Sequence, residues 1–485
     1  MSDASFRTLK RSFDFEPWRA DARPLGDAVR SYATHPALRS AAVEELELDD
    51  EFHRRALRPE DLSFIDLTQA VTASTVTRLP NLAVHRLLSA IHDLGVAGLP
   101  RDGSAESFAR VAEFGSDEQR VLAARILPFL EAYAFDFLET GERRDATGAD
   151  AAAAHLRQHV DAEARQWGTV LQRLETTRFV EDGLRFALIQ NWSLAPAKRT
   201  ALARAAAARF FEPLGPECSP RLIIPSLPDA DVRRLAAHCG VKRQQHAYWQ
   251  FYLSTSLASC NLLNALARRP DRALRAYGAA FAAEGEWLAF GCLVERGAQA
   301  LGLGELVPDA RTSGAVDELV ARFGRALGIV EKRWGARGVA EVTHGLEMAT
   351  ALGAVVRRNL GEQFRWLSSV RLYQRIAQRI DARIAAEWPD IDRDTFVEPR
   401  EMCSTTHVHD DHRLVVIESG DMVFWGNVGM TLRMAPGEMV LVPQGRLHGS
   451  SIESDECVYH QPIIPDDWVR PLLAELDPDG AALVG

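Results

Sequence analysis

Apolar residues recur at every third or fourth position over most of the first 385 residues of this 485-residue chain. This spacing places them on one face of an α-helix, so the pattern predicts an overwhelmingly helical region. The segments that show it best are residues 82–94, 151–174, 248–266, 273–301, 316–330 and 341–356. Breaks that contain glycine and proline separate these segments, and the sequence has no repeat period.

The pattern changes after Trp388 and Pro389. From Thr395 onward the apolar runs are short, and turn dipeptides such as Ser419-Gly420 and Pro436-Gly437 separate them. Many short strands with glycine and proline turns are typical of an all-β sandwich or barrel. The predicted strands are residues 414–417, 422–425, 430–434, 439–442 and 457–460, and residues 466–476 are predicted to form a closing helix.

Composition and charge restrict the class of protein. Hydrophobic residues make up 47% and charged residues 25% of the chain, as in an ordinary globular protein. The net charge of −11 argues against a nucleic-acid or membrane-surface binder. The chain has no apolar run of about 18 residues, and the N-terminus lacks the apolar core of a signal peptide. We therefore expect a cytoplasmic protein with no membrane or nucleic-acid partner.

Three histidines in the β-rich segment are the strongest chemical signal. His407 and His409 lie two positions apart, and residues two apart in a strand face the same side. His448, on a neighbouring strand, could complete a set of three neutral nitrogen ligands. Such a set suits iron(II), zinc, manganese or nickel and leaves positions open for substrate and dioxygen. Open positions indicate chemistry rather than a structural metal site.

The spacing around these histidines resembles the cupin superfamily of small metal-binding β-barrels. His407, His409 and Gly420 match its first motif, and the second is matched by Gly437, Pro443, Gly445 and His448. Arg413 stands where many cupins carry a glutamate ligand. Because arginine cannot ligate a metal, the resemblance implies that three histidines alone hold the ion. The alternative is a cupin barrel that has lost its metal.

Other residues of this segment are candidates for supporting roles. Tyr459 could hydrogen-bond the substrate or an oxygen held at the metal, or it could be an ordinary core tyrosine. Arg413 is a candidate to bind a substrate carboxylate, whereas Arg446 is predicted to be a solvent-exposed arginine. His412 is predicted to lie at the surface or behind the ligands, and His460 to face away from Tyr459.

A helical region followed by a cupin resembles the N-nitrosourea synthase family of the streptozotocin pathway. Residues 81–88, 246–253, 397–400, 446–449 and 452–459 carry this resemblance. It implies an N-terminal helical dimerisation region (1–140), a haem-oxygenase-like helical domain (141–390) and a metal-binding cupin (391–485). It also implies a homodimer, Fe(II) held by His407, His409 and His448, and a pocket tyrosine at Tyr459.

In that family the helical domain carries a di-iron centre, and its ligands do not carry over well. Glu284 lies where one glutamate is expected, but the segment 210–232 has five prolines and no histidine. Ser313, Asp317 and Val320 stand where a histidine, an aspartate and a second histidine are expected. Two helical groups remain, and both are predicted to be solvated surface positions: Glu341, His344 and Glu347, and the pair His155 and His159. The sequence therefore predicts that the helical domain is a scaffold with a degenerate di-iron site.

The resemblance implies a non-haem iron oxygenase of natural-product biosynthesis. Its substrate would be an N-hydroxylated arginine or similar guanidine-type amino acid, and oxidation with dioxygen would form an N–N bond in an N-nitroso or diazeniumdiolate product. One alternative is a non-catalytic metal- or ligand-binding scaffold or sensor, although a sensor would more often carry a DNA-reading element. Another is a non-oxidative metallo-cupin, which three histidines also permit.

Overall fold

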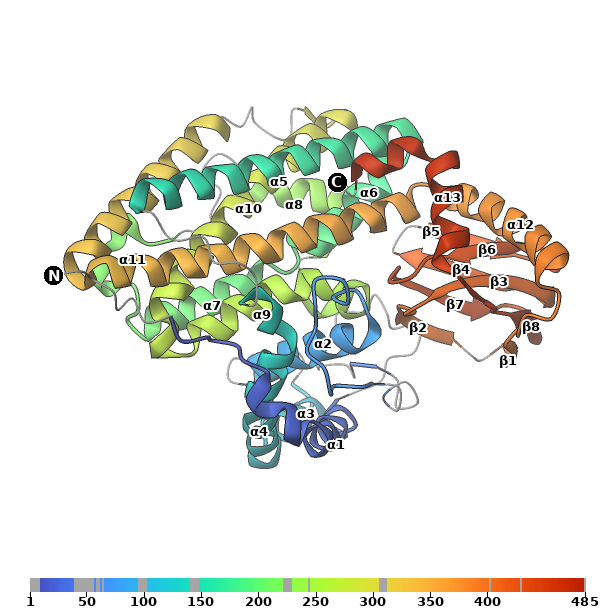
Figure 1. Ribbon diagram of the computed structural model, residues 1–485, viewed down its shortest axis with the longest axis horizontal. Helices are drawn as coiled ribbons and strands as arrows, with labels where there is room; N and C mark the ends of the chain where they lie inside the picture. The colour runs from blue at the N-terminus through green and yellow to red at the C-terminus, as the bar shows by residue number, and fades with distance from the viewer. Residues whose placement is uncertain are drawn as a thin grey trace.

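The structure is a computed structural model in which helices fill one part of the molecule and antiparallel strands the other (Figure 1). It describes residues 9–38, 56–57, 62, 65–94, 103–139, 148–220, 229–242, 245–304, 312–400, 403–427 and 430–483. The predicted fold class, helical domains followed by a cupin-like β domain, is confirmed. Among the described helices, none is both long and apolar enough to cross a membrane.

The N-terminal helices form a small group beside the strands (Figure 1). Their bounds are η1 Glu16–Asp21, α1 Ala22–Ala33, α2 Leu79–Asp93, α3 Ala105–Phe114, α4 Asp117–Phe135 and η4 Asp136–Leu138. The side chains of Ser104 and Ser116 accept backbone N–H groups in the first turns of α3 and α4. Such caps satisfy donors that the helix itself leaves free, and they fix where each helix begins. Helix α2 packs against α4 and against α9 of the central bundle.

The central bundle is built on three long helices that pack on one another, α5, α10 and α11. Its elements are α5 Ala149–Thr177, α6 Val180–Asn191, α7 Ala195–Ala207, η5 Glu212–Leu214, η6 Pro216–Cys218, α8 Asp229–His238, η7 Gln245–Phe251, α9 Ser254–Ala267, η8 Pro270–Arg272, α10 Ala273–Ala300, α11 Thr312–Leu367 and α12 Val370–Glu387. Two glycines allow α10 and α11 to approach closely. A Cβ on Gly278 would lie 1.9 Å from the Val342 carbonyl oxygen, and one on Gly345 would lie 2.0 Å from that of Arg275.

The helical predictions are largely confirmed, with two differences. The predicted helix 248–266 is divided into η7 and α9, because Leu253 between them has an extended backbone (ψ 148°). Residues 316–330 and 341–356 were predicted as two helices, but both belong to α11, which changes direction at Gly335 (φ 65°). The pattern could not show this junction because a glycine between two periodic segments usually indicates a break. The proline-rich segment 210–232 forms only short turns in its described part before α8 begins, and residues 221–228 lie outside the described residues.

The β domain consists of two antiparallel sheets, with strand orders β1-β8-β3-β6 and β2-β7-β4-β5, and β9 pairs with β3. The strands are β1 Thr395–Pro399, β2 Cys403–His407, β3 His412–Ser419, β4 Met422–Asn427, β5 Met430–Met434, β6 Met439–Val442, β7 His448–Ile452, β8 Glu456–His460 and β9 Ile463–Ile464. Helix α13 (Asp466–Leu476) confirms the predicted closing helix, and it is followed by η10 Pro478–Leu483. Helix α12 packs against β6 and α13 against α12 (Figure 1). The domain boundaries at 140/141 and 390/391 stay predictions.

Candidate metal centre

Three histidine side chains converge in the sheet that contains β2 and β7. His407 ends β2 and lies opposite His448, the first residue of β7, in the antiparallel register. His409 follows just beyond the end of β2. One ring nitrogen from each histidine lies within 4.8 Å of the other two, and the ring centroids are 4.5–4.8 Å apart. Bonds from zinc to imidazole nitrogen are about 2.0–2.1 Å long, so modest side-chain rotations would bring all three nitrogens onto one ion.

The surroundings of His448 suit it to metal binding. Its Nδ1 lies 2.8 Å from the carbonyl oxygen of Arg446. A carbonyl oxygen only accepts hydrogen bonds, so Nδ1 carries the proton and Nε2 is left with its lone pair. Burial, together with nearby His407, holds the pKa of His448 well below its ordinary value. The ring is therefore neutral, as a ligand must be, and Phe424 stacks on it at a centroid distance of 5.5 Å. This donor set fits a divalent transition metal.

Arg413 and Tyr459 lie in the other sheet, on the same face of it. Ile417 of β3 pairs with Tyr459 of β8, and Arg413 precedes Ile417 by an even number of residues, so strand alternation places all three on one face. The neighbour of Arg413, His412, faces the other way and contacts Asp466 at the start of α13 (3.2 Å). Arg413 and Tyr459 therefore point away from α13.

The immediate partners of these two side chains are protein groups. Arg413 Nη1 donates hydrogen bonds to Asp394 Oδ2 (3.2 Å) and to the carbonyl oxygen of Gln461 (3.3 Å). Tyr459 is 4% exposed, and its ring stacks on Phe396 at a centroid distance of 5.3 Å. Substrate binding by Arg413 and a catalytic role for Tyr459 stay predictions.

Arg446 and His412, which lie near the three histidines in the sequence, are both buried. Arg446 was predicted to be solvent-exposed, which is wrong. It is 4% exposed and forms an ion pair with Glu362 of α11. The sequence could not show this because the covering helix lies far away along the chain. His412 is also buried, and its Nδ1 accepts the backbone N–H of Gln444 (3.1 Å), so it supports the loop before His448. His460 contacts Glu418 (3.1 Å).

Gly445, the last glycine of the second motif, has a conformational reason to be glycine. Its φ is +70°, and a Cβ there would lie 2.7 Å from Thr77 Oγ1. Gly445→Ala is therefore expected to lower the free energy of unfolding by at least about 1–2 kcal/mol, the cost of a left-handed backbone for a non-glycine residue. Urea unfolding measures this loss. Gly437→Ala is the matched control, because Gly437 has φ +85° but open space around it. Gly445→Ala should lose more free energy of unfolding than Gly437→Ala. Equal losses in these two variants would show that the contact between residue 445 and Thr77 is not tight.

No protein-family model matches the chain. Its sequence aligns over 477 residues with a nitrosourea synthase from Streptomyces achromogenes subsp. streptozoticus, with 26% identity. The alignment covers 91% of this chain and 96% of the Streptomyces protein. The chain resembles nitrosourea synthase. The likeness to nitrosourea synthase extends over both the helical and the β-rich parts, so the resemblance inferred from the sequence is confirmed.

The carboxylates at the predicted di-iron positions of the helical region are paired with other protein groups. Glu284 on α10 is 3% exposed, and its carboxylate pairs with Arg322 of α11. Arg322 also donates to the carbonyl oxygen of Ser219 (2.9 Å). Asp317 lies at the surface and pairs with Arg157 (2.6 Å). The carboxylate expected to be an iron ligand is thus engaged by a guanidinium.

A second group with metal-ligand chemistry lies inside the bundle. The prediction that His159 is a surface residue is wrong, because it is 5% exposed and groups with Glu163 and Glu286. Its Nε2 is 3.5 Å from Glu286 Oε1, while Lys198 Nζ is 3.3 Å from Glu286 Oε2. Glu163 pairs with Arg357, and Lys198 lowers the pKa of Glu286 against the opposing effect of burial. Two carboxylates thus face two cations, and we interpret the group as an ion-pair network that joins α5, α7, α10 and α11.

His344 and His155 also differ from the prediction that they lie at the surface of the helical region. His344 is 4% exposed and lies 3.0 Å from Glu139. Glu341 pairs with Arg275 (2.5 Å). His155 is half-buried and hydrogen-bonds Thr350 (2.9 Å). These residues serve packing between helices, and amphipathic spacing alone could not distinguish such a polar interface from a solvated face.

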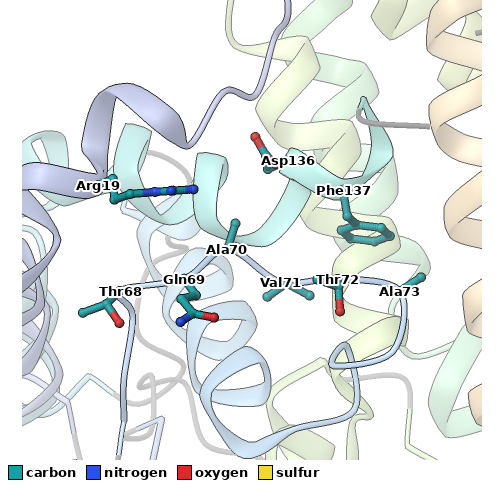
Figure 2. Close-up of a pocket in the computed structure, with 9 residues that line it drawn as sticks. All are labelled: Arg19, Thr68, Gln69, Ala70, Val71, Thr72, Ala73, Asp136 and Phe137. Atoms are coloured by element: carbon teal, nitrogen blue, oxygen red, sulfur yellow. The ribbon is translucent and has the colours of Figure 1, made fainter. Parts of the chain in front are cut away.

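A pocket of about 790 Å³ lies among the N-terminal helices, lined by residues other than the three histidines. Figure 2 shows the segment from Thr68 to Ala73 passing beside Asp136 and Phe137, with Arg19 reaching in from a neighbouring helix. Asp136 already accepts hydrogen bonds from Arg11 and from the backbone N–H of Phe15. We assign this pocket no chemistry.

Proposed function

We propose that this protein is a non-haem iron oxygenase that forms an N–N bond in natural-product biosynthesis. The proposed substrate is an N-hydroxylated arginine or a related guanidine-type amino acid, and the product is an N-nitroso compound or a diazeniumdiolate. The observation that carries the proposal is the convergence of His407, His409 and His448, with ligand nitrogens within 4.8 Å of one another. The near full-length likeness to nitrosourea synthase supports the reaction class.

In this proposal the three histidines hold one Fe(II) ion, which when bound supplies redox chemistry with dioxygen. Three neutral ligands leave the positive charge of the ion uncompensated, which favours an anionic, chelating substrate. They also leave several coordination positions open, as a catalytic site requires. The Arg446 carbonyl keeps the proton on Nδ1 of His448, so the other ring nitrogen stays available to the ion.

Arg413 and Tyr459 are proposed to orient the substrate. The guanidinium of Arg413 suits a substrate carboxylate, because its planar donors match two carboxylate oxygens. The side chain of its present partner, Asp394, is half-exposed and that of Arg413 is 18% exposed, so water partly screens the pair and lowers the cost of exchanging Asp394 for a substrate carboxylate. The Tyr459 hydroxyl is proposed to donate a hydrogen bond to a substrate oxygen while its ring stays packed on Phe396.

The helical region is proposed to be a scaffold and part of a homodimer. The pairing of Glu284 with Arg322 supports this, because a guanidinium takes the place next to a predicted iron ligand. If the helical region does not hydroxylate the substrate, a separate N-hydroxylating enzyme has to supply it. The proposed iron content is therefore one ion per chain, in the cupin-like domain.

The decisive experiment combines metal content with turnover. Protein loaded with Fe(II) under anaerobic conditions is expected to hold one iron per chain and to consume dioxygen when N-hydroxylated methylarginines are added. Mass spectrometry of the product, with isotope-labelled guanidine nitrogens, should show both nitrogens in one N–N bond. The His407→Ala variant is the control and should be inactive. Iron-loaded protein that leaves all such substrates unchanged would refute the proposal, and substrate conversion without dioxygen would favour a non-oxidative metallo-cupin.

A further inference from the structure

Each of the three histidines is a sequence neighbour of a residue that is hydrogen-bonded to the helical part of the molecule. Thr406, before His407, accepts a hydrogen bond from Arg86 of α2 at its carbonyl oxygen (3.4 Å). Asp410, after His409, accepts the backbone N–H of Leu79 at the start of α2 (3.0 Å). Leu447, before His448, pairs with Gln363 of α11. Three separate contacts thus reach all three positions.

The contact through Gln363 is the most specific of the three. Its side chain is completely buried, and its amide pairs with both backbone polar groups of one residue, Leu447. Gln363 Oε1 accepts the Leu447 N–H (3.1 Å), and Gln363 Nε2 donates to the Leu447 carbonyl oxygen (3.4 Å). The preceding residue, Arg446, donates to the backbone and side-chain oxygens of Asn359 (3.3 and 3.4 Å). The loop that carries His448 is therefore fixed to α11 over two consecutive residues.

Arg86 fixes the strand that ends at His407. This side chain is 3% exposed. Its Nη1 donates to the carbonyl oxygen of Ala56 (2.9 Å), and its Nη2 donates to those of Gln250 (3.1 Å) and Thr406 (3.4 Å). These bonds join three distant stretches of chain at one guanidinium. Because the bonds go to backbone atoms, they restrain the path of the chain rather than one side chain.

The third contact uses the N-terminus of α2. The Leu79 N–H belongs to the first turn of this helix, where backbone donors have no partner within the helix. The Asp410 carboxylate accepts it, and the helix dipole favours a negative charge at this end. A further backbone bond, from Gly445 N–H to the His409 carbonyl oxygen (2.9 Å), links the His409 and His448 segments to each other.

We propose that the helical part positions the metal ligands, with Arg86, Gln363 and the start of α2 acting as positioning elements for His407, His448 and His409. The inference rests on the proposed metal site and extends it. Chain segments that carry ligands can shift by fractions of an ångström when such supports are lost, and loss of an outer partner typically weakens metal binding about 10–100-fold. The helical scaffold thus contributes to metal affinity without providing a ligand.

The test compares two buried glutamines that make the same kind of contact. In the full-length protein, Gln363→Met removes both bonds to Leu447 while keeping the side-chain volume. Gln190→Met is the matched control, because Gln190 is also buried and pairs with the Phe251 carbonyl oxygen (2.7 Å) and the Leu253 N–H (3.0 Å). The measurements are the Co(II) dissociation constant by chelator competition and the visible absorption spectrum of the Co(II) protein, which reports ligand geometry.

We expect Gln363→Met to raise the Co(II) dissociation constant at least about 10-fold and to change the spectrum. Gln190→Met should leave both unchanged, although both variants lose stability. If Gln363→Met does not fold, Asp410→Ala provides the decision, because Asp410 is partly exposed and its loss should also weaken Co(II) binding. A folded Gln363→Met variant with wild-type Co(II) affinity and spectrum would overturn the inference. If Gln363→Met does not fold, wild-type Co(II) affinity and spectrum in Asp410→Ala would overturn it. Wild-type protein that binds no Co(II) would instead refute the proposed metal site itself.

Discussion

Replacing His448 by alanine is expected to abolish tight iron binding. The substitution leaves two ligands, so the chelate is lost, and it removes the buried, neutral imidazole whose orientation Phe424 and the Arg446 carbonyl fix. Loss of an outer partner alone typically costs about 10–100-fold in affinity, so loss of a ligand should cost more than about 100-fold. Iron titration against a chelator, followed by metal analysis per chain, measures the effect.

The matched control is another histidine of the same domain. His460 ends β8 and contacts Glu418, and it is not one of the three converging histidines. His460→Ala should keep wild-type iron affinity and stoichiometry. Unfolding of both apo-variants separates loss of ligand from loss of fold. An His448→Ala protein that holds iron as tightly as the wild type would show that the ion binds elsewhere.

Replacing Arg322 by methionine is expected to lower the free energy of unfolding by about 3–5 kcal/mol. Arg322 and Glu284 have side-chain exposures of 3% and 4%, so the pair lies out of water. The substitution removes the guanidinium that pairs with this buried carboxylate and also removes the bond to the Ser219 carbonyl. The charge of the carboxylate is then less well compensated out of water, which destabilises the folded protein. Urea unfolding measures the change.

Two further variants make this second prediction specific. The double variant Arg322→Met with Glu284→Leu should recover most of the loss, because buried pairs can be replaced by apolar groups of similar volume at little net cost. Arg157→Met, which breaks the exposed pair with Asp317, should cost less than about 1 kcal/mol. If the Glu284 substitution instead removed bound iron, this carboxylate would be a metal ligand and the scaffold proposal would be wrong.

The sequence predicted the parts of the fold whose signal is periodic. The helices α5 and α10 and the strands β3 and β6 follow their apolar patterns closely. The strands that carry metal ligands were harder to predict. Residues 403–407 read Cys-Ser-Thr-Thr-His and 448–452 read His-Gly-Ser-Ser-Ile. They carry little of the apolar alternation that identifies a strand, because they present ligands and small polar groups.

The candidate site was predictable only where local spacing determines it. Val408 separates His407 from His409 by one position, and their rings lie together although His409 follows just beyond the end of β2. Arg446 is buried beside Glu362, and His159 beside Glu286, and these partners lie far away in the sequence. No pattern within one segment contains that information, and both residues were therefore predicted to be solvent-exposed.

The contacts of α11 and α2 with the ligand loops bear on how the protein should be dissected. A fragment starting at residue 391 would follow the predicted domain boundary and keep all three histidines. It would lose Arg86, Leu79 and Gln363, the groups that brace those loops. Under the positioning proposal, metal affinities measured on such a fragment would describe a loosened site, so a dissection has to keep α2 and α11 together with the β domain.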